Sequence, residues 1–386
     1  IAALARKGER MKDRLALFPK TYEASRERFR KNLSVVQERW GGATLSKKQI
    51  SDDDLSVDWI SADALERNEK VLIFTTGEHG VEGYVGSAML QHLIETYLPR
   101  LDPRTTGLLL VHSINPWGMK HHRRVNANNI DLNRNFLWDI SFDPTFNPEY
   151  DSIVEAYDPA KPIRSFALSN LAFYASSLWF LTQQSFSSLN HTFLIGQYRN
   201  PQGLHYGGED YEPETRLLID LYRQALGAYD QILHLDMHTG YGPRYQMSIV
   251  NSALEKGSSK SFAQKFDYPL VVAANPEEFY AIQGDMVDYL YALGQNEFPE
   301  KKLFSTAFEF GTLGDKLPGI VGSPRAMIFE NRLFWHGVKN KKFAERIKHD
   351  FEELFNPSAD DWRIKAVADG DQAIHGILKA EGYLSE

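Results

Sequence analysis

The chain reads VLIFTTGEHGVEG from residue 71 to residue 83, an apolar run followed at once by a glycine-rich polar turn. Residues 71–77 are rich in β-branched and aromatic side chains and end at Gly77, which predicts a buried strand. Residues 85–101 then carry apolar side chains at helical spacing and stop before Pro103, which predicts a helix. A strand, a turn and a helix in this order are typical of an α/β protein with a parallel sheet.

More apolar runs follow along the chain. Those at residues 108–115, 232–237 and 303–310 have the length and composition of buried strands, and shorter strand-like runs lie at 249–251 and 270–274. Helical patterns separate several of these strands. We therefore expect the α/β class, with a mixed, mostly parallel twisted sheet and helices on both faces.

The chain has 386 residues, of which 42% are hydrophobic and 24% are charged, as in an ordinary folded protein. We expect residues 1–60 to form a helical N-terminal extension and residues 61–332 to form the main domain that carries the sheet. We expect an aromatic-rich insertion within that domain at about 140–210. Residues 333–386 are expected to be C-terminal helices packed on the same domain.

Charge and hydropathy exclude several classes of partner. Lys and Arg number 43 against 51 Asp and Glu, a net charge of −8, which argues against a nucleic-acid partner. The low-charge run at residues 166–182 falls short of a membrane span, and we expect a buried amphipathic helix there. The first residues carry too many charges for a secretion signal. We therefore expect no membrane partner and a cytoplasmic location.

The chain has no cysteine, so His, Asp and Glu side chains must hold any transition metal. Sites in open α/β sheets form at the carboxyl ends of the strands. The turn after the first strand carries His79 and Glu82, and the third strand leads into His238. Two imidazoles and a carboxylate form the His₂Glu set of catalytic zinc, which leaves a fourth position open. Glu309 lies at the end of the last predicted strand.

The His-x-x-Glu spacing alone is a weak signal, since short motifs also occur by chance. The pattern occurs three times, at His79/Glu82, His92/Glu95 and His349/Glu352. Only the first pair lies on a glycine-flanked turn after a buried strand. The other two pairs are typical of solvated helix faces.

The segment RVNANNIDLNRNF, residues 124–136, is the second group of candidate site residues. The guanidinium groups of Arg124 and Arg134 can bind carboxylates and stabilise oxyanions. Asn133 adds amide donors, and Asp131 can orient a metal-bound imidazole. The same composition also suits a polar surface loop with asparagine turns.

Taken together, these motifs resemble the zinc carboxypeptidase (metallocarboxypeptidase) family over about residues 71–312. The resemblance implies that His79, Glu82 and His238 hold one Zn²⁺ per chain. Glu309, in the segment AFEFG, matches the catalytic glutamate of the family. The N-terminal extension and the insertion have no obvious counterpart, which suggests a divergent bacterial-type branch.

The resemblance also assigns roles around the metal ligands. Arg124 corresponds to the arginine that stabilises the oxyanion. Asn133 and Arg134 correspond to the pair that holds the terminal carboxylate of the substrate. Asp131 corresponds to the partner of the first histidine ligand, and Tyr280 to the tyrosine that caps the substrate.

The resemblance implies a zinc-dependent enzyme, a metallocarboxypeptidase that cleaves an amide bond next to a free carboxylate. An N-acyl amino acid deacylase, like aspartoacylase or succinylglutamate desuccinylase, is the alternative, because these enzymes share the Asp-Leu-Asn-Arg and Glu-x-Gly segments. The continuation Asn135-Phe136 and Tyr280 favour the carboxypeptidase. A pseudo-enzyme that binds peptides or metal without turnover is a third possibility. The expected substrate is a peptide or acyl amino acid with a free carboxylate, and the oligomeric state stays open.

Overall fold

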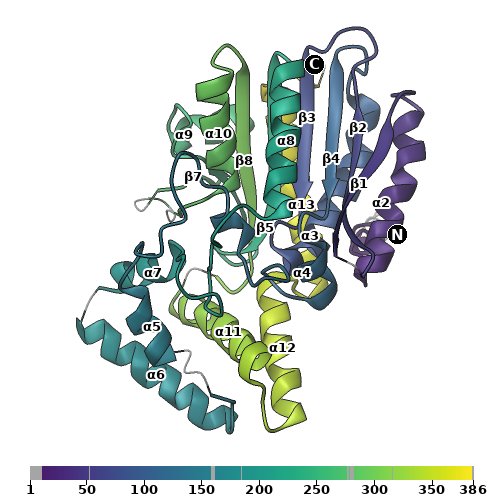
Figure 1. Ribbon diagram of the computed structural model, residues 1–386. Helices are drawn as coiled ribbons and strands as arrows, with labels where there is room; N and C mark the ends of the chain where they lie inside the picture. The colour runs from purple at the N-terminus through teal and green to yellow at the C-terminus, as the bar shows by residue number, and fades with distance from the viewer. Residues whose placement is uncertain are drawn as a thin grey trace.

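The computed structural model describes residues 11–384 except 52, 158–160, 184, 276–277, 279–281 and 315. Within these residues, one eight-stranded sheet has the order β1-β2-β4-β3-β5-β8-β6-β7 (Figure 1). The strands are β1 (Thr44–Ser51), β2 (Leu55–Ala62), β3 (Lys70–Thr76), β4 (Thr106–His112), β5 (Gln231–Gly240), β6 (Met247–Asn251), β7 (Val271–Ala273) and β8 (Lys302–Gly311). The four central strands β4, β3, β5 and β8 run parallel, and antiparallel pairs flank them. This mixed, mostly parallel sheet confirms the predicted fold class.

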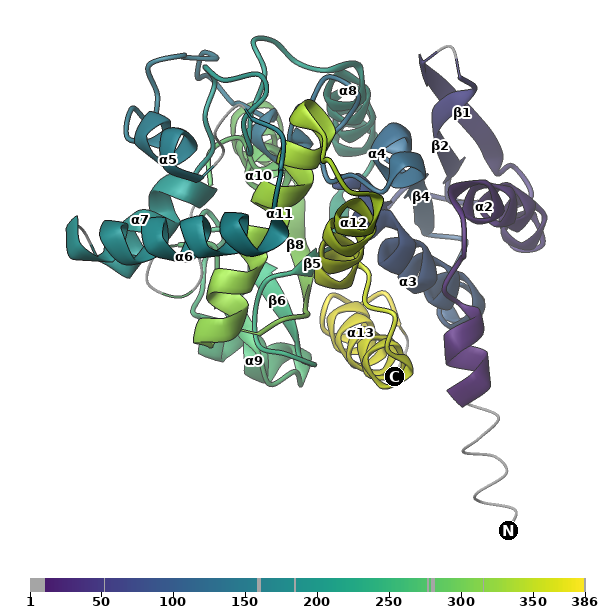
Figure 2. The ribbon, with the colours of Figure 1, turned by 90° about the horizontal axis from the view of Figure 1, so that it is seen from below.

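Helices cover both faces of the sheet (Figures 1 and 2). They include α2 (Tyr22–Gln37), α3 (Gly83–Thr96), α4 (Pro116–His121), α8 (Pro213–Ala228), α9 (Ser259–Phe266), α10 (Met286–Glu297) and α13 (Asp360–Ala380). One apolar core joins α3, α9 and α13 to the sheet, and a second joins α8 and α10 to the opposite face. Along β3, Leu72 and Phe74 belong to the first core, whereas Val71 and Ile73 belong to the second. The run is therefore apolar at every position because both faces of this strand are buried.

A third group of helices lies beyond the carboxyl ends of the parallel strands, below the sheet in Figure 1. It consists of α5 (Tyr150–Tyr157), α6 (Phe166–Gln183), α7 (Phe186–Leu194), α11 (Leu317–His336) and α12 (Lys341–Phe355). A separate apolar cluster joins this group to Val81, in the turn after β3. Helices from distant parts of the chain thus meet at the edge of the sheet where a site is expected.

The structure differs from the sequence prediction at residues 44–62, where we expected helix and where β1 and β2 form a hairpin on the edge of the sheet. Asp58 of β2 is fully buried, and its charge is compensated by Arg30 of α2 at 2.6 Å. This pairing joins distant residues, so the local sequence does not reveal it. The six predicted strands and the helix after β3 are confirmed. The division of the chain into extension, main domain, insertion and C-terminal helices stays a prediction.

The low-charge run forms helix α6 as predicted, but one of its faces is exposed rather than buried. Among the residues that the structure describes, no helix is long and apolar enough to cross a membrane.

The packing of α13 on α9 gives a test of the fold. A Cβ atom at Gly376 would lie 1.8 Å from the carbonyl oxygen of Phe266, at the end of α9. We expect Gly376→Ala to lower the free energy of unfolding by about 1–3 kcal/mol through overpacking. The direction of the change is informative, because replacing Gly by Ala in a helix with free space around the residue raises the free energy of unfolding by about 1 kcal/mol. Urea unfolding measures the change.

Gly42→Ala is the control, because nothing lies within 4 Å of a Cβ atom at Gly42. We expect a change within about 0.5 kcal/mol there. A Gly376→Ala variant as stable as the original protein would contradict the close approach of α13 to α9.

Candidate metal centre

The turn after β3 positions the first two candidate ligands. His79 precedes the short 3₁₀ helix η1 (Gly80–Glu82), which ends with the second candidate, Glu82. Gly77 adopts a φ of +68°, and a Cβ atom there would lie 2.1 Å from Ser113 Oγ. The turn therefore needs glycine, because a side chain would both strain the backbone and collide with the end of β4.

The register of the central strands positions the other two residues. His238 of β5 lies opposite Glu309 of β8 in the parallel ladder. β5 also pairs with β3, so the turn that carries His79 leaves the sheet beside the end of β5. The sheet thus brings together four side chains that are separated by up to 230 positions in the sequence.

Both histidines turn the same ring atom toward one point. His79 Nε2 is hydrogen-bonded to Asp131 Oδ1 at 3.0 Å, and His238 Nε2 forms an ion-pair contact with Asp236 Oδ2 at 2.5 Å. With a carboxylate at each Nε2 atom, the two Nδ1 atoms face each other, 3.3 Å apart. A proton or a metal ion between the two Nδ1 atoms would bridge the rings.

Glu82 completes this group of donors. Its Oε1 lies 2.9 Å from His79 Nδ1, and its Oε2 lies 3.4 Å from His238 Nδ1. In a tetrahedral zinc site with bonds of about 2.0–2.1 Å, ligand atoms lie about 3.3 Å apart. The separations of 2.9–3.4 Å among these atoms therefore fit a tetrahedral ion.

The electrostatics of the group favour positive charge. Burial lowers the pKa of His238, but the charges of Asp236 and Glu82 outweigh burial and raise that pKa well above its ordinary value. Burial raises the pKa of Glu82, and the two histidines outweigh it and hold that pKa below its ordinary value. The site thus attracts a proton or a metal ion between its donors.

Glu78 is a rival for the role of carboxylate ligand, because Glu78, His79 and His238 also form a buried group able to hold a metal ion. Its Oε2 lies 3.4 Å from His238 Nε2, the ring atom that faces away from His79. Burial and the neighbouring Asp236 raise the pKa of Glu78 well above its ordinary value, which favours its neutral form. Glu82 is the better ligand because it lies on the side that both Nδ1 atoms share.

Asp131 links the candidate metal centre to the arginine segment. Its Oδ1 accepts from His79, and its Oδ2 contacts Arg124 Nη1 and accepts from His205 Nδ1 at 3.0 Å. Burial alone would raise the pKa of Asp131, but the charges of Arg124, Arg134 and His79 hold it well below its ordinary value. An ionised carboxylate thus orients a histidine and a guanidinium at once.

Glu309 lies beside the candidate ligands as a separate carboxylate. Its Oε1 accepts a hydrogen bond from the Tyr241 backbone N–H at 2.9 Å, as Glu82 Oε2 accepts one from the Thr239 N–H at 2.8 Å. Burial, followed by the Glu82 charge, raises the pKa of Glu309 to about 8. The main chain after His238 therefore holds both acids in place.

In the arginine segment, the side chains of Arg134 and Asn133 already form hydrogen bonds within the protein. Arg134 is almost fully buried, and its Nε donates to the Leu194 carbonyl at the end of α7 at 3.1 Å. Its Nη1 donates to the Asn133 carbonyl at 2.7 Å. The side-chain oxygen of Asn133 accepts from the Met286 N–H at 3.0 Å. Tyr280, the predicted capping residue, lies outside the described residues.

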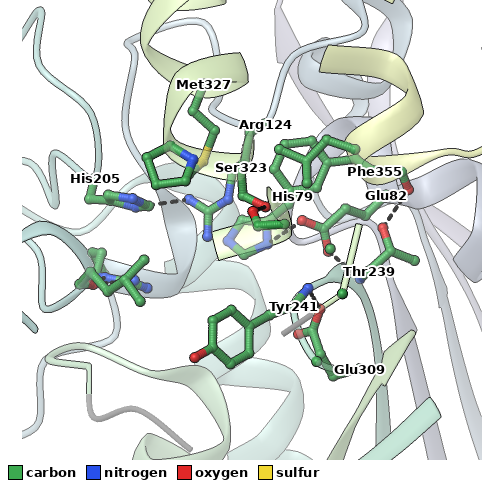
Figure 3. A pocket seen from close by; sticks show the side chains of 18 residues that line it. His79, Glu82, Arg124, His205, Thr239, Tyr241, Glu309, Ser323, Met327 and Phe355 are labelled. Atoms are coloured by element: carbon green, nitrogen blue, oxygen red, sulfur yellow. Dashed lines mark hydrogen bonds and ion pairs between the residues drawn. The ribbon is translucent and has the colours of Figure 1, made fainter. Parts of the chain in front are cut away.

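A cavity gathers most of these residues, as Figure 3 shows. His79, Glu82, Arg124, Arg134 and Glu309 line it. The helices beyond the sheet cover it with Leu194 from α7, Ser323 and Met327 from α11, and Leu354 and Phe355 from α12. Helices α7, α11 and α12 therefore form part of the wall of the cavity.

Sequence reasoning missed several residues of this site. His205, which the sequence analysis does not include among the candidate site residues, is buried, lines the cavity and is hydrogen-bonded to Asp131. Burial lowers the pKa of His205 to about 3, so its ring is neutral. Asp236 was visible as the residue two positions before His238, on the same strand face. Glu78 had no distinguishing signal in the sequence.

A family model described as "Protein of unknown function (DUF2817)" matches residues 18–369. No curated protein matches the chain.

Solved structures with a similar fold include bovine thrombin-activatable fibrinolysis inhibitor, with 15% identity over 83% of this chain and 96% of that chain and a TM-score of 0.45. Carboxypeptidase A from Helicoverpa armigera has 15% identity over 89% of this chain and 73% of that one, with a TM-score of 0.44. A succinylglutamate desuccinylase from Silicibacter has 15% identity over 76% and 67%, with a TM-score of 0.37. At 15% identity these likenesses concern the fold alone.

Metal content tests the choice between the two candidate carboxylates. We expect the protein reconstituted with zinc to hold close to one ion per chain. Glu82→Gln should bind zinc at least about 10-fold more weakly, because an amide replaces a charged ligand. Glu78→Gln should keep the ion, because Glu78 lies beside His238 Nε2 and not beside the two Nδ1 atoms. Metal analysis after dialysis against a weak chelator measures both, and the opposite order of affinities would make Glu78 the ligand.

Proposed function

The chain belongs to the DUF2817 family, whose description assigns no function, and we propose that it is a zinc-dependent hydrolase. The proposed reaction is cleavage of an amide bond next to a free carboxylate, as in a metallocarboxypeptidase. One observation carries the proposal. Two imidazole Nδ1 atoms and a carboxylate face one point at tetrahedral spacing, with a second buried carboxylate beside them.

His79, Glu82 and His238 are the proposed zinc ligands. The donor set of two imidazoles and one carboxylate suits zinc, and it leaves a position free for the reaction. When bound, zinc supplies Lewis-acid chemistry that polarises a carbonyl group and makes water a stronger nucleophile. Asp131 holds His79 in the orientation that this set requires.

Glu309 is the proposed general base and acid. Glu309 of β8 lies opposite His238 of β5, so it is beside the proposed ligands but is not proposed as one of them. The carboxylate takes a proton from the attacking water and returns it to the nitrogen of the leaving amine. The raised pKa of Glu309, about 8, suits a group that must both accept and release a proton near neutral pH.

The two arginines of the cavity are proposed to bind the substrate. Arg124 lies between Asp131 and the cavity, where it can donate to the oxygen of the carbonyl under attack. Arg134 and the amide nitrogen of Asn133 are proposed to hold the free carboxylate. Arg134 already donates to two backbone carbonyls, so a substrate carboxylate would use its remaining donors. The capping role of Tyr280 stays a prediction.

A second candidate is an N-acyl amino acid deacylase, and the cover over the cavity favours it. Side chains from α7, α11 and α12 enclose the candidate centre, which leaves little room for a long peptide. A single acylated amino acid would fit such an enclosed site with less rearrangement. The intact set of ligands, base and arginine argues against a pseudo-enzyme without turnover.

Replacing the proposed base tests the mechanism. We expect Glu309→Gln to keep zinc but to lose about 10²–10⁴-fold in kcat, because the amide cannot take the proton from water. Glu214→Gln is the matched control, since Glu214 is also buried but lies in α8 outside the residues that line the cavity. Metal analysis and kcat are measured on both variants. Loss of zinc from Glu309→Gln would mean that ligand and base are misassigned.

Two kinds of substrate separate the candidate functions. Benzoylglycyl-phenylalanine tests removal of a C-terminal residue, and N-acetyl and N-succinyl amino acids test deacylation. For whichever is cleaved, we expect amidation of the free carboxylate to lower kcat/KM at least about 30-fold, because a buried charge pair is lost. Equal rates on the free and amidated compounds would contradict a carboxylate site at Arg134.

A further inference from the structure

His205 lies in the segment between α7 and α8, and its ring reaches Asp131 (Figure 3 shows it beside Arg124). His205 Nδ1 lies 3.0 Å from Asp131 Oδ2, and both side chains are buried. Arg124 Nη1 lies farther from the same nitrogen, at 3.3 Å. The ionised carboxylate of Asp131 can only accept, so this contact is a hydrogen bond with the proton on His205 Nδ1.

Asp131 is the residue through which His205 reaches the candidate metal centre. Asp131 Oδ1 is hydrogen-bonded to His79 Nε2 at 3.0 Å, and Asp131 Oδ2 also contacts Arg124 Nη1. One carboxylate is thus shared by a proposed metal ligand and by the arginine proposed to bind the carbonyl oxygen. A third donor restricts the rotation of this carboxylate, and with it the orientation of both neighbours.

His205 supplies this donor without adding charge. Burial lowers the pKa of His205 to about 3, so the ring is neutral at physiological pH. A lysine or arginine in its place would put a second positive charge beside Arg124 and compete for the charge of Asp131. The neutral ring leaves the ion pair between Asp131 and Arg124 intact.

The backbone around His205 is fixed to the same carboxylate residue. His205 has a φ of +53°, in the left-handed region that residues other than glycine rarely adopt. Its carbonyl accepts from the Gln197 N–H at 3.1 Å, and the Tyr206 carbonyl accepts from the Asp131 N–H at 2.8 Å. The ring of Phe193 packs edge-on against the imidazole, with ring centroids 5.3 Å apart. A backbone in a sparsely populated region persists where its surroundings determine it, and Asp131 is part of those surroundings.

We propose that His205 is a positioning residue of the hydrolase: it fixes the Asp131 carboxylate, which orients His79 for metal binding and Arg124 toward the cavity. This inference rests on the proposed function. The segment between α7 and α8 thereby contributes to the reaction without supplying a ligand or the base.

Direct contact with the substrate is the rival role, because His205 also lines the cavity. Within the part of the chain that the structure describes, His205 Nε2 is buried and has no hydrogen-bond partner. A substrate would have to displace neighbouring side chains to reach this atom. The two roles differ in kinetics, since a lost substrate contact raises KM, whereas a disordered Asp131 weakens zinc binding and lowers kcat.

Removing the donor tests the role. We expect His205→Leu to raise the zinc dissociation constant at least about 10-fold and to lower kcat at saturating zinc at least about 10-fold, with KM within about 3-fold. His205→Gly should lose as much, and it is the second variant because glycine relieves the positive φ and so favours folding. Competition with a chelating indicator measures zinc affinity, kinetics on whichever substrate is cleaved give kcat and KM, and urea unfolding checks the fold.

Two further variants separate the donor from the packing of the ring. His205→Asn should stay within about 3-fold of the original protein in zinc affinity and kcat. Its amide nitrogen is attached to Cγ, as Nδ1 is, and asparagine tolerates the left-handed region. His191→Leu, at an exposed histidine of α7, is the control and should change neither quantity.

Cobalt in place of zinc gives a readout that does not depend on turnover. The visible spectrum of bound Co²⁺ reports the geometry of its ligands. We expect the spectrum to change in His205→Leu and His205→Gly and to stay unchanged in His205→Asn, because only the first two variants release Asp131.

Four results decide against the proposal in different ways. Zinc affinity and kcat within about 3-fold of the original in both His205→Leu and His205→Gly would overturn it. A rise in KM alone would make His205 a substrate contact instead. An equal loss in His205→Asn would assign the effect to the shape of the ring rather than to its donor. An original protein that binds no zinc would overturn the proposed function itself, and this inference with it.

Discussion

Strand β5 pairs in parallel on both sides, with β3 and with β8. This pairing places the residues of the candidate metal centre at one edge of the sheet. A shift of the β5–β8 ladder by one residue would turn Glu309 to the opposite face of the sheet from His238. Apolar cores on both faces of these strands hold the register, since every residue of the central strands packs against a helix layer or a neighbour. The hydrophobic packing of the sheet therefore determines which polar groups meet at its end.

The groups that meet there are mostly acidic, and they are buried. Glu78, Glu82, Asp131, Asp236 and Glu309 all have side chains at most 6% exposed. Burying carboxylates without partners is costly, so such a cluster is stable only with compensating charge. Arg124 compensates Asp131, whereas burial and Asp236 raise the pKa of Glu78. The two histidines and Glu82 form the part of the cluster in which three donor atoms face one point, which is the physical basis for proposing a metal there.

The sequence predicts the centre of this protein better than its periphery. The six apolar strands were visible because strands buried on both faces are apolar at every position. The hairpin of β1 and β2 was not visible in the sequence, because Asp58 of β2 is buried only through its ion pair with Arg30 of α2. The sequence also indicated His79, Glu82, His238 and Glu309 from their places after strands. The contribution of His205 depends on a long-range hydrogen bond to Asp131, and no local pattern encodes it.

Each of the two acids beside the histidines accepts a hydrogen bond from a backbone amide. The N–H groups of residues 239 and 241 point at Glu82 and Glu309 because of the path of the chain at the end of β5. Substitution at either position leaves these donors in place. The side chain of Tyr241 lines the cavity, whereas its backbone N–H holds Glu309. A different side chain at this position would therefore reshape the cavity wall while the main-chain donor to the acid is retained.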